Sequence, residues 1–485
     1  MKQIDVTRST VTLDPDRSHV LARPFRVSSS QRSTKICARV MALPEKEVHT
    51  LLEGVRAEFG GRQVNIDEFL RGRFEQVSPF LLKGQRLSEE RKLLLGGYFT
   101  HEYSLEAAAL FNPSMIPHPD QSGVPPGSLR FIISLRATAE GHISSIAFRG
   151  GTMDAGGNVT MDAASRYCLE PAQEPNSSFE KPLFERKLQE LGLMGAFNWD
   201  VLHGLADVFT MEELRASIKR AAKQIPEYAQ KTTKGIADET LMLAQSNYQV
   251  HFTSESDLSE RVLFPVSPSQ SNGIEDARFV HFQQEDGSRI YYATYTAYDG
   301  RIILPQFLET SDFLHFKFIT LNGPAIENKG MALFPRKING LYAMLGRQDG
   351  ENIYVMYSDH LHFWHEMQLI LEPRFTWEFI QLGNCGSPIE TEAGWLVISH
   401  GVGPMRTYCI GAFLLDRNDP TKVIGRLPEP LIKPNLDERD GYVPNVVYSC
   451  GCLVHGRLLI IPYGYSDYAT TFATAPLDQV LAAME

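Results

Sequence analysis

The stretch Arg289-Ile-Tyr-Tyr-Ala-Thr-Tyr-Thr-Ala-Tyr298 is rich in aromatic and β-branched residues, and the turn-forming pairs Asp286-Gly287 and Asp299-Gly300 flank it. This composition between such turns is typical of a β-strand. From about residue 246 to the C-terminus, similar short segments follow one another. They are 314–321, 341–347, 352–358, 395–401, 408–416 and 446–463. The sequence therefore predicts a mainly β fold, and the spacing alone does not choose among a sandwich, a barrel and a propeller.

The N-terminal part of the chain has a different pattern. Residues 1–95 are expected to form an α/β extension, with a helix after Pro44, where apolar residues recur at helical spacing, and another at 88–95. Strand-like segments begin near residue 105, with 130–136 and 142–148 as neighbours. We therefore place a domain boundary near residue 95 and assign 96–485 to the β domain.

A second helical region interrupts this β domain at about 170–245. Thr210-Met-Glu-Glu213 is a capping box, because Thr210 can cap the amide of Glu213 and Glu213 can reach back. Apolar residues then recur along one face until Pro226, which ends the helix. We expect this region to be a helical insertion.

Composition and charge limit the classes of function. The chain has 485 residues, with 47 Lys and Arg against 58 Asp and Glu, so its formal net charge is 47 − 58 = −11. We expect no nucleic-acid partner, because polyanion binding relies on clustered cations. The sequence contains no run of 18 consecutive apolar residues, so we expect no membrane partner. The six scattered cysteines indicate reduced thiols and a cytoplasmic location. The helical parts are candidate surfaces for a homo-oligomer.

The segment Asn272-Gly-Ile-Glu-Asp-Ala-Arg278 carries the most unusual chemistry. In a regular strand neighbouring residues point to opposite faces, so Asp276, and not Glu275, should share a face with Arg278. An adjacent arginine favours the charged form of a carboxylate, while burial opposes it. A carboxylate held in this balance is suited to donate or accept a proton. The alternative is an ordinary turn followed by an ion pair on an edge strand.

A second group of residues is basic or hydroxyl-bearing. Lys329 and Arg347 lie around one predicted strand, and His400 and Tyr408 lie on two later ones, 395–401 and 408–416. Together they are able to hold an oxyanion such as phosphate, because each supplies hydrogen-bond donors. Their convergence depends on the fold, and each taken singly is an ordinary solvated or satisfied polar residue.

The run Asp359-His-Leu-His-Phe-Trp-His365 contains three histidines, which are common metal ligands. A metal site needs convergent ligands and a supporting second layer of contacts. A loop that packs Phe363 and Trp364 explains the run more simply. We therefore expect no metal and no organic cofactor.

The segment 272–278 resembles the catalytic signature of glycoside hydrolase family 130, the β-mannoside phosphorylases and related β-mannosidases. Other segments resemble the same family in the same order. They are 332–340, 394–402, 422–426, 441–447 and 463–467. The resemblance covers about 246–485 and extends more loosely to Asn112-Pro113 and Ser134-Leu-Arg136.

This resemblance implies a five-bladed β-propeller with the active site in its central depression. It implies inverting phosphorolysis of β-mannosides, with inorganic phosphate as co-substrate and α-mannose 1-phosphate as product. Asp276 matches the general acid, which passes its proton through the 3-hydroxyl of the sugar. The phosphate-binding positions are Lys329, Arg347, His400 and Tyr408, and the substrate-binding positions are Asn112, Arg136, Glu275, Arg278 and Asp467.

Two other functions remain open at this stage. A β-mannosidase on the same fold would use water and a base carboxylate, for which Glu275, Glu390 and Glu392 are candidates. A non-catalytic propeller would bind carbohydrate without turnover. The basic positions favour the phosphorylase, since phosphate requires a donor-rich site. β-1,2-linked manno-oligosaccharides are common substrates among relatives, but the sequence does not fix the linkage.

Overall fold

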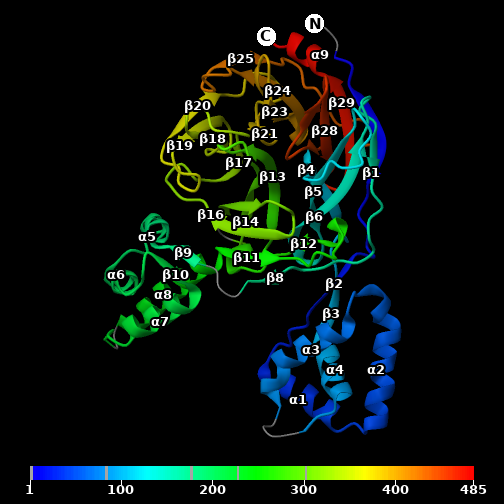
Figure 1. The fold of residues 1–485 in the computed structure, drawn as a ribbon, viewed down its shortest axis with the longest axis vertical. Coiled ribbons are helices and arrows are strands. Elements are labelled where there is room, and N and C mark those ends of the chain that lie inside the picture. Colours follow the sequence, from blue (N-terminus) through cyan, green and yellow to red (C-terminus); the bar gives the residue numbers. More distant parts are fainter. Residues whose placement is uncertain (1–3, 82–85, 175–177, 227–228, 301–302) are drawn as a thin grey trace.

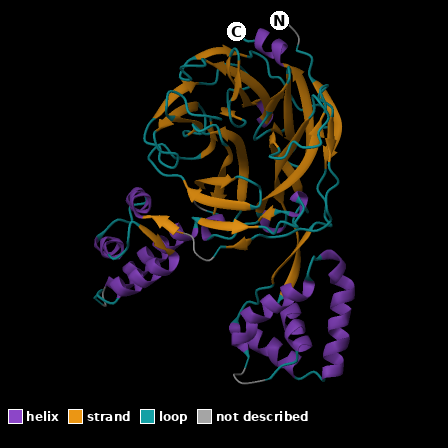
Figure 2. Cartoon of the chain, viewed as in Figure 1, coloured by secondary structure: helices purple, strands orange, loops and turns teal. Residues whose placement is uncertain are grey.

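The computed structural model of the chain describes residues 4–81, 86–174, 178–226, 229–300 and 303–485. A β body carries two helical projections, one near the N-terminus and one inserted in the chain (Figures 1 and 2). The fold is mainly β, as the sequence predicts. No helix within the described ranges is long and apolar enough to cross a bilayer.

Five antiparallel sheets build the β body, here numbered 1 to 5 along the chain. Sheet 1 contains β4 (Ala109–Pro117), β5 (Leu129–Thr138), β6 (Ser144–Met153), β7 (Val159–Met161) and β12 (Val262–Leu263). Sheet 2 contains β13 (Ile274–Gln283), β14 (Arg289–Tyr298), β15 (Ile303–Thr310), β16 (His315–Thr320), β11 (Tyr248–His251) and β8 (Ala172–Gln173). Sheet 3 contains β17 (Lys329–Leu333), β18 (Tyr342–Arg347), β19 (Ile353–Ser358) and β20 (Met367–Leu371).

The last two sheets contain the C-terminal strands. Sheet 4 contains β21 (Gln381–Asn384), β22 (Ile389–Thr391), β23 (Gly394–Gly403), β24 (Thr407–Leu415) and β25 (Val423–Arg426). Sheet 5 contains β26 (Val447–Tyr448), β27 (Leu453–His455), β28 (Leu458–Tyr465), β29 (Ala469–Pro476) and β1 (Thr7–Leu13). Helix α9 (Leu477–Ala482) follows β29.

Each sheet contacts the next, and sheet 5 returns to sheet 1. The contacts between strands are β4 with β13, β14 with β17, β18 with β21, β24 with β26, and β28 with β4. A separate apolar cluster fills each of these five seams. The seams contain, in that order, Phe148 with Phe279, Phe307 with Met344, Phe334 with Trp395, Leu396 with Ile461, and Phe472 with Phe131. The strands β4, β13, β17, β21 and β26 each form one edge of their sheet, and we call them the leading strands. Their polar ends are thereby brought toward one another.

The strand predictions are confirmed with one exception. Segment 289–298 is β14, and 395–401 lies within β23. The predicted strand 446–463 is instead three strands, β26, β27 and β28. The break arises because the Cys450 amide donates to the Pro113 carbonyl, 2.7 Å away, and the Gly451 carbonyl accepts from Met115. The segment between β26 and β27 therefore pairs with β4 instead of continuing its own strand.

The N-terminal extension contains four helices, α1 (Ser30–Met41), α2 (Glu45–Phe59), α3 (Ile66–Val77) and α4 (Glu89–Tyr98). The helices predicted after Pro44 and at 88–95 are confirmed as α2 and α4. Strand β2 (Val20–Pro24) pairs with β3 (Thr100–Ser104) and joins the helices to the β body. Strand β1, however, pairs with β29 in sheet 5, so residues 7–13 lie in the β body and outside the extension expected at 1–95.

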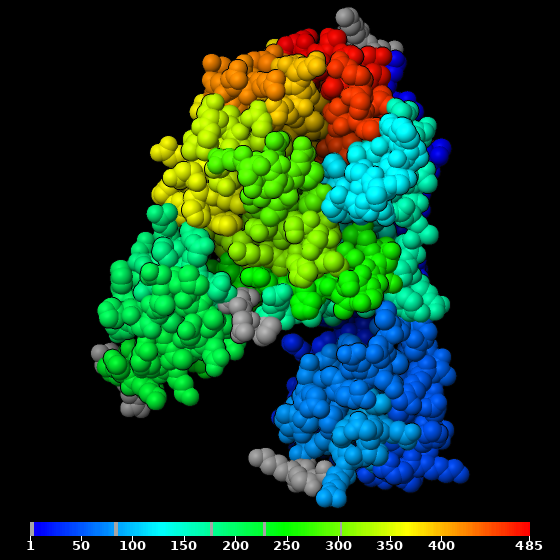
Figure 3. All heavy atoms as spheres, in the orientation of Figure 1, coloured from blue at the N-terminus to red at the C-terminus, as the bar shows by residue number. Residues whose placement is uncertain are grey.

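The inserted helices are α5 (Lys181–Glu190), α6 (Ala196–His203), α7 (Met211–Ala222) and α8 (Gln230–Gln245), with a short ribbon of β9 (Ser178–Glu180) and β10 (Val208–Thr210). The predicted capping box is present, since Thr210 accepts from the Glu213 amide and Glu213 accepts from the Thr210 amide at 2.8 Å. The helices pack around their own apolar cluster, which includes Leu188, Phe209 and Leu214. In Figure 3 the insertion and the extension are separate projections from the β body.

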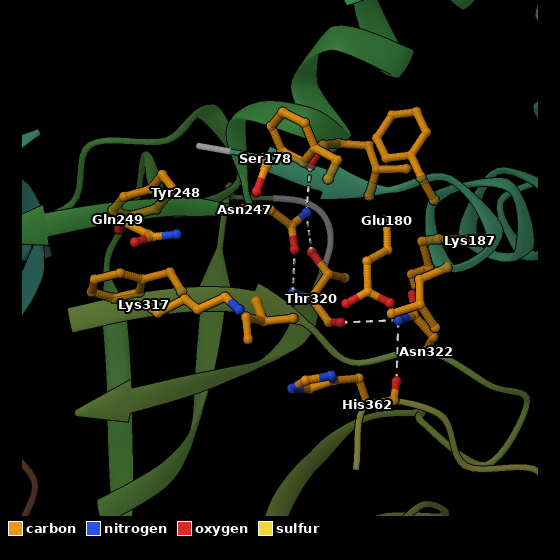
Figure 4. Close-up of a pocket in the computed structure, with 16 residues that line it drawn as sticks. Ser178, Glu180, Lys187, Asn247, Tyr248, Gln249, Lys317, Thr320, Asn322 and His362 are labelled. Atoms are coloured by element: carbon orange, nitrogen blue, oxygen red, sulfur yellow. Dashed lines mark hydrogen bonds between the residues drawn. The ribbon is translucent and has the colours of Figure 1, made fainter. Parts of the chain in front are cut away.

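Polar contacts anchor the insertion to the end of β16 (Figure 4). The Asn247 side chain accepts from the Thr320 amide at 2.8 Å and donates to the Thr320 hydroxyl at 3.1 Å. The buried Lys187 ammonium donates to the Leu321 carbonyl at 3.0 Å and pairs with Glu190, also at 3.0 Å. The bonds to Thr320 and Leu321 exist only while the insertion stays docked, and the buried Lys187 ammonium loses a partner when it detaches.

We predict that Lys187→Met loosens the insertion, because it leaves the Leu321 carbonyl without its donor. The change should weaken the docking of the insertion by about 1–3 kcal/mol. Limited proteolysis of residues 178–247 should become faster. Lys219→Met, at an exposed position of α7, is the matched control. Equal cleavage rates in the two variants would contradict the assigned anchor.

Candidate active site

The leading strands of sheets 1, 2 and 3 share one irregularity. Three residue steps on the leading strand lie opposite two on its neighbour. The steps run from Phe111 to Ser114 in β4, from Glu275 to Arg278 in β13 and from Lys329 to Ala332 in β17. The first residue inside each bulge has a positive φ, 50° at Asn112, 54° at Asp276 and 90° at Gly330. Asn, Asp and Gly are the residues that tolerate this conformation best, and a bulge re-aims the side chains next to it.

The bulge in β13 corrects the face assignment made from the sequence. Regular alternation would separate Glu275 from Asp276, but Arg136 reaches both carboxylates. Its Nη2 lies 2.8 Å from Glu275 Oε1, and its Nη1 lies 3.3 Å from Asp276 Oδ1. The period of two fails here because the positive φ at Asp276 turns its side chain toward sheet 1.

Asp276 is buried, with 8% of its surface exposed. The Asn112 amide donates to its Oδ1 at 2.7 Å. Burial by itself raises the pKa of this carboxyl, but the charges of Arg136, Arg278 and Lys329, and the bond from Asn112, lower it to about 2. Asp276 is therefore ionised in the free protein at neutral pH.

Arg278 extends the centre toward sheets 4 and 5. Its Nη1 donates to the Asp276 backbone carbonyl at 3.1 Å, and its Nη2 donates to the Tyr448 hydroxyl at 2.8 Å. The ring of Tyr448 packs 4.8 Å from the ring of His400, measured between centroids. A continuous series of contacts thus connects Asp276 to His400 through buried side chains.

His400 is paired with Arg347 across the seam between sheets 3 and 4. Arg347 Nη1 lies 3.1 Å from His400 Nε2. A guanidinium can only donate, so Nε2 accepts and the ring proton resides on Nδ1. Burial lowers the pKa of His400 well below its usual value, and the charge of Arg347 lowers it further. The imidazole is therefore neutral and orients the guanidinium.

Lys329 and Tyr408 lie at the edges of this group. The Lys329 ammonium is 3.9 Å from Glu275 Oε2 and is partly exposed. The Tyr408 ring stacks on His400 with centroids 6.0 Å apart, and the Arg406 guanidinium lies over the Tyr408 ring, 5.3 Å from its centre. Cationic and hydroxyl groups from sheets 3 and 4 therefore gather on one side of the centre.

Asp467 is the predicted site residue with the weakest connection. Among the described residues, its carboxyl has no hydrogen-bond or ion-pair partner, but Arg136 and Asp276 both influence it electrostatically. Burial raises the pKa of Asp467 to about 6, although Arg136 opposes this change. The other nine predicted residues form a connected group once Tyr448, between Arg278 and His400, is included. They are Asn112, Arg136, Glu275, Asp276, Arg278, Lys329, Arg347, His400 and Tyr408.

Other sequence candidates lie elsewhere. Glu390 forms ion pairs with Arg336 at 2.7 Å and Arg417 at 2.9 Å, and Glu392 is exposed. Among the described residues, no group of three or more His, Cys, Asp or Glu side chains is arranged to hold a metal ion. The sequence interpretation missed Tyr448, which directly follows the quoted segment 441–447, because nothing local distinguishes it from a core tyrosine.

The comparisons with known proteins agree with this geometry. A family model described as β-1,4-mannooligosaccharide phosphorylase, that of glycoside hydrolase family 130, matches residues 221–485. The chain belongs to glycoside hydrolase family 130. This confirms the resemblance seen in the motifs, and the protein is an enzyme of this phosphorylase family.

Individual relatives extend the match. This family 130 enzyme is 39% identical over 218 residues to a 1,2-β-oligomannan phosphorylase of Thermoanaerobacter sp., covering 43% of this chain and 70% of the relative. It is 28% identical over 346 residues to a β-1,2-mannobiose phosphorylase of Listeria innocua, covering 70% of this chain and 91% of the relative. A solved structure of the Listeria innocua phosphorylase with β-1,2-mannobiose has a TM-score of 0.47 at 20% identity, covering 79% and 92%.

We predict that Gly383→Ala disrupts the Arg347–His400 pair. A Cβ at residue 383 would lie 2.4 Å from His400 Cε1 and 3.2 Å from Arg347 Cδ. Overpacking of this kind costs about 1–3 kcal/mol, and an equal loss of transition-state stabilisation would lower kcat/KM by about 5- to 150-fold. Gly54→Ala in α2, where no atom lies within 4 Å of the new Cβ, is the control. Unchanged kinetics for Gly383→Ala would show that the pair is not needed.

We predict that Asp467→Asn stabilises the protein in a pH-dependent way. The native pKa, about 6, lies above the unfolded value, so ionisation of Asp467 opposes folding increasingly as the pH rises. Removing the charge should increase the free energy of unfolding by on the order of 2–3 kcal/mol at pH 8 and by little at pH 4. Thermal unfolding at both pH values, with the exposed Asp440→Asn as control, tests this. An equal change at both pH values would contradict it.

Proposed function

We propose that this enzyme cleaves β-mannosides with inorganic phosphate, with inversion, to give α-mannose 1-phosphate. The preferred substrates in this proposal are β-1,2-linked manno-oligosaccharides. Three relatives support the linkage by their names, a 1,2-β-oligomannan phosphorylase and two β-1,2-mannobiose phosphorylases. The observation that carries the proposal is the buried carboxylate of Asp276 beside cationic groups from sheets 1, 2 and 3.

In this proposal Asp276 supplies the proton for the leaving group. It protonates the 3-hydroxyl oxygen of the mannosyl residue as that hydroxyl gives its own proton to the glycosidic oxygen. The bond from C1 to the glycosidic oxygen breaks, and a phosphate oxygen forms a bond to C1 from the opposite face. Phosphate arrives as an anion, so no base carboxylate is required.

The low pKa of Asp276 fits this role only when ligands are bound. Arg136, Arg278 and Lys329 keep the carboxyl ionised in the free enzyme. An anionic phosphate near Lys329 and Arg347 would offset part of this positive charge and raise the pKa. Phosphate binding is therefore proposed to prepare the acid as well as to provide the nucleophile.

The remaining residues are assigned by their places around Asp276. Arg347, Lys329 and Tyr408 are proposed to contact phosphate, and His400 to hold Arg347 in position, because its Nε2 accepts from that guanidinium. The proposed sugar-binding positions are Asn112, Arg136, Glu275, Arg278 and Asp467. Arg136 has a dual role, since it also fixes the orientation of Asp276.

The same proposal includes the architecture and the setting of the enzyme. The five sheets, contacting one another in a cycle, support a five-bladed β-propeller with the site at its centre. The division into an extension at 1–95 and a catalytic domain at 96–485 remains a prediction, with β1 contributed to the last sheet. Six free thiols support a cytoplasmic location. A homo-oligomer through the helical parts also remains a prediction.

The decisive assay is incubation with β-1,2-, β-1,3- and β-1,4-mannobiose, each with and without inorganic phosphate. We expect mannose 1-phosphate in the α configuration only when phosphate is present, with the β-1,2 substrate preferred. Mannose released at the same rate without phosphate would instead identify a hydrolase. Binding without turnover under both conditions would identify a carbohydrate-binding protein.

We predict that Asp276→Asn reduces kcat for phosphorolysis and for the reverse reaction by about 100- to 10,000-fold, because the proton donor is lost. The Asn side chain should keep the bond with Asn112 or its neighbours and preserve the fold. Asp286→Asn, at an exposed turn of the same sheet, is the control. A variant at 276 with near-normal kcat would exclude Asp276 as the acid.

A further inference from the structure

A cavity lies away from the candidate active site, in the groove between helix α3 of the extension and the β body. Its volume is about 520 Å³. Residues 63–76 form one wall, and residues 21–22, 168–172 and 251–253 form the other. Typical small-molecule sites have volumes of about 300–1,000 Å³. The groove is therefore large enough for a small organic ligand.

Arg73 lines this groove and is 7% exposed. Its Nη1 donates to Gln76, and its guanidinium lies 5.3 Å from the Phe69 ring centre. Within the described part of the chain, neither Nε nor Nη2 has a hydrogen-bond partner, and Arg73 has no ion pair. A buried donor without an acceptor, such as this Nε, is costly, because it has lost water and gained no partner.

The same edge is occupied in several other arginines of this chain, whereas Nε is also unpaired in the buried Arg278, Arg347 and Arg426. In four of them Nε and Nη2 donate to the two oxygens of a single carboxylate. These pairs are Arg8 with Glu438, Arg56 with Asp67, Arg336 with Glu390 and Arg457 with Asp478. The Nε–Nη2 edge thus selects a bidentate oxyanion, and Arg73 presents it, more buried, to an open groove.

Neighbouring groups add to this preference for an anion. Gln63 lines the groove, and its amide Nε2 is buried without an acceptor. Burial lowers the pKa of Arg73, the positive charge of Arg23 adds to this, and Glu170 opposes it. Glu170 is itself paired with Arg23, and Glu68, the other carboxylate on the groove, accepts from Asn65 at 2.8 Å.

We propose that the groove between α3 and the β body binds a small organic oxyanion, a phosphomonoester or a carboxylate, through the Nε–Nη2 edge of Arg73 and the amide of Gln63. The walls beside this edge are apolar and include Phe69 and Phe252. The ligand would therefore have a body that packs against these side chains. Because it would touch both the extension and the β body, its binding would stabilise their mutual docking.

Calorimetric titration of the full chain carrying Arg347→Ala tests this proposal, because the change removes the proposed catalytic phosphate contact. The probes are inorganic phosphate, α-mannose 1-phosphate and succinate. We expect one equivalent of at least one probe to bind, with about tenfold or greater weakening by Arg73→Gln. Arg71→Gln, on the exposed side of the same helix, should leave the affinity unchanged. If the phosphate probes bind more strongly, the ligand is a phosphomonoester. If succinate binds more strongly, the ligand is a carboxylate.

Absence of saturable binding by all three probes, or an affinity that Arg73→Gln leaves unchanged, would overturn the proposal. If Arg73→Gln does not fold, Gln63→Leu decides the matter, since residue 63 is half-buried and tolerates an apolar side chain. The Gln63→Leu change should weaken binding of the probe about threefold or more. An unchanged affinity in that variant would also overturn the proposal. The outcome is separable from phosphorolysis, because Arg73 and Gln63 lie outside the candidate active site, so weaker binding in these variants reports on the groove and not on residual binding beside Asp276.

Discussion

The shared contact of Arg136 with Glu275 and Asp276 is the interaction on which the centre depends. Two adjacent carboxylates in a strand should diverge, and they converge here because a bulge with a positive φ turns one of them. The guanidinium that receives them comes from another sheet. Sheets 1 and 2 must therefore be packed against each other before either carboxylate has its partner.

Repetition explains how the remaining groups are brought in. The same bulge occurs in β4, β13 and β17, so Asn112, Asp276 and Gly330 occupy equivalent places in three sheets. The residues opposite the bulges include Arg136 and Arg347. One local irregularity, repeated around the cycle of sheets, thus directs amide, carboxylate and guanidinium groups toward a common point.

Burial gives these groups properties that they would not have in water. Asp276 remains ionised because several cations offset its loss of hydration, while His400 stays neutral because burial and Arg347 act in the same direction. The two helical parts are attached to the β body differently. The insertion docks through satisfied polar contacts of Lys187 and Asn247, whereas the extension leaves the guanidinium edge of Arg73 open at its junction.

The sequence by itself determined the mainly β character, most strand positions, the capping box at Thr210 and the family, because these depend on local composition or on ordered motifs. Nine of the ten site residues named from those motifs belong to one contact group when Tyr448 is included. Only the tertiary structure decided that Glu275 and Asp276 share Arg136, that Tyr448 joins Arg278 to His400, and that β1 completes sheet 5. Each of these results depends on pairing between distant segments or on a single positive φ, and neither leaves a periodic signal in the sequence.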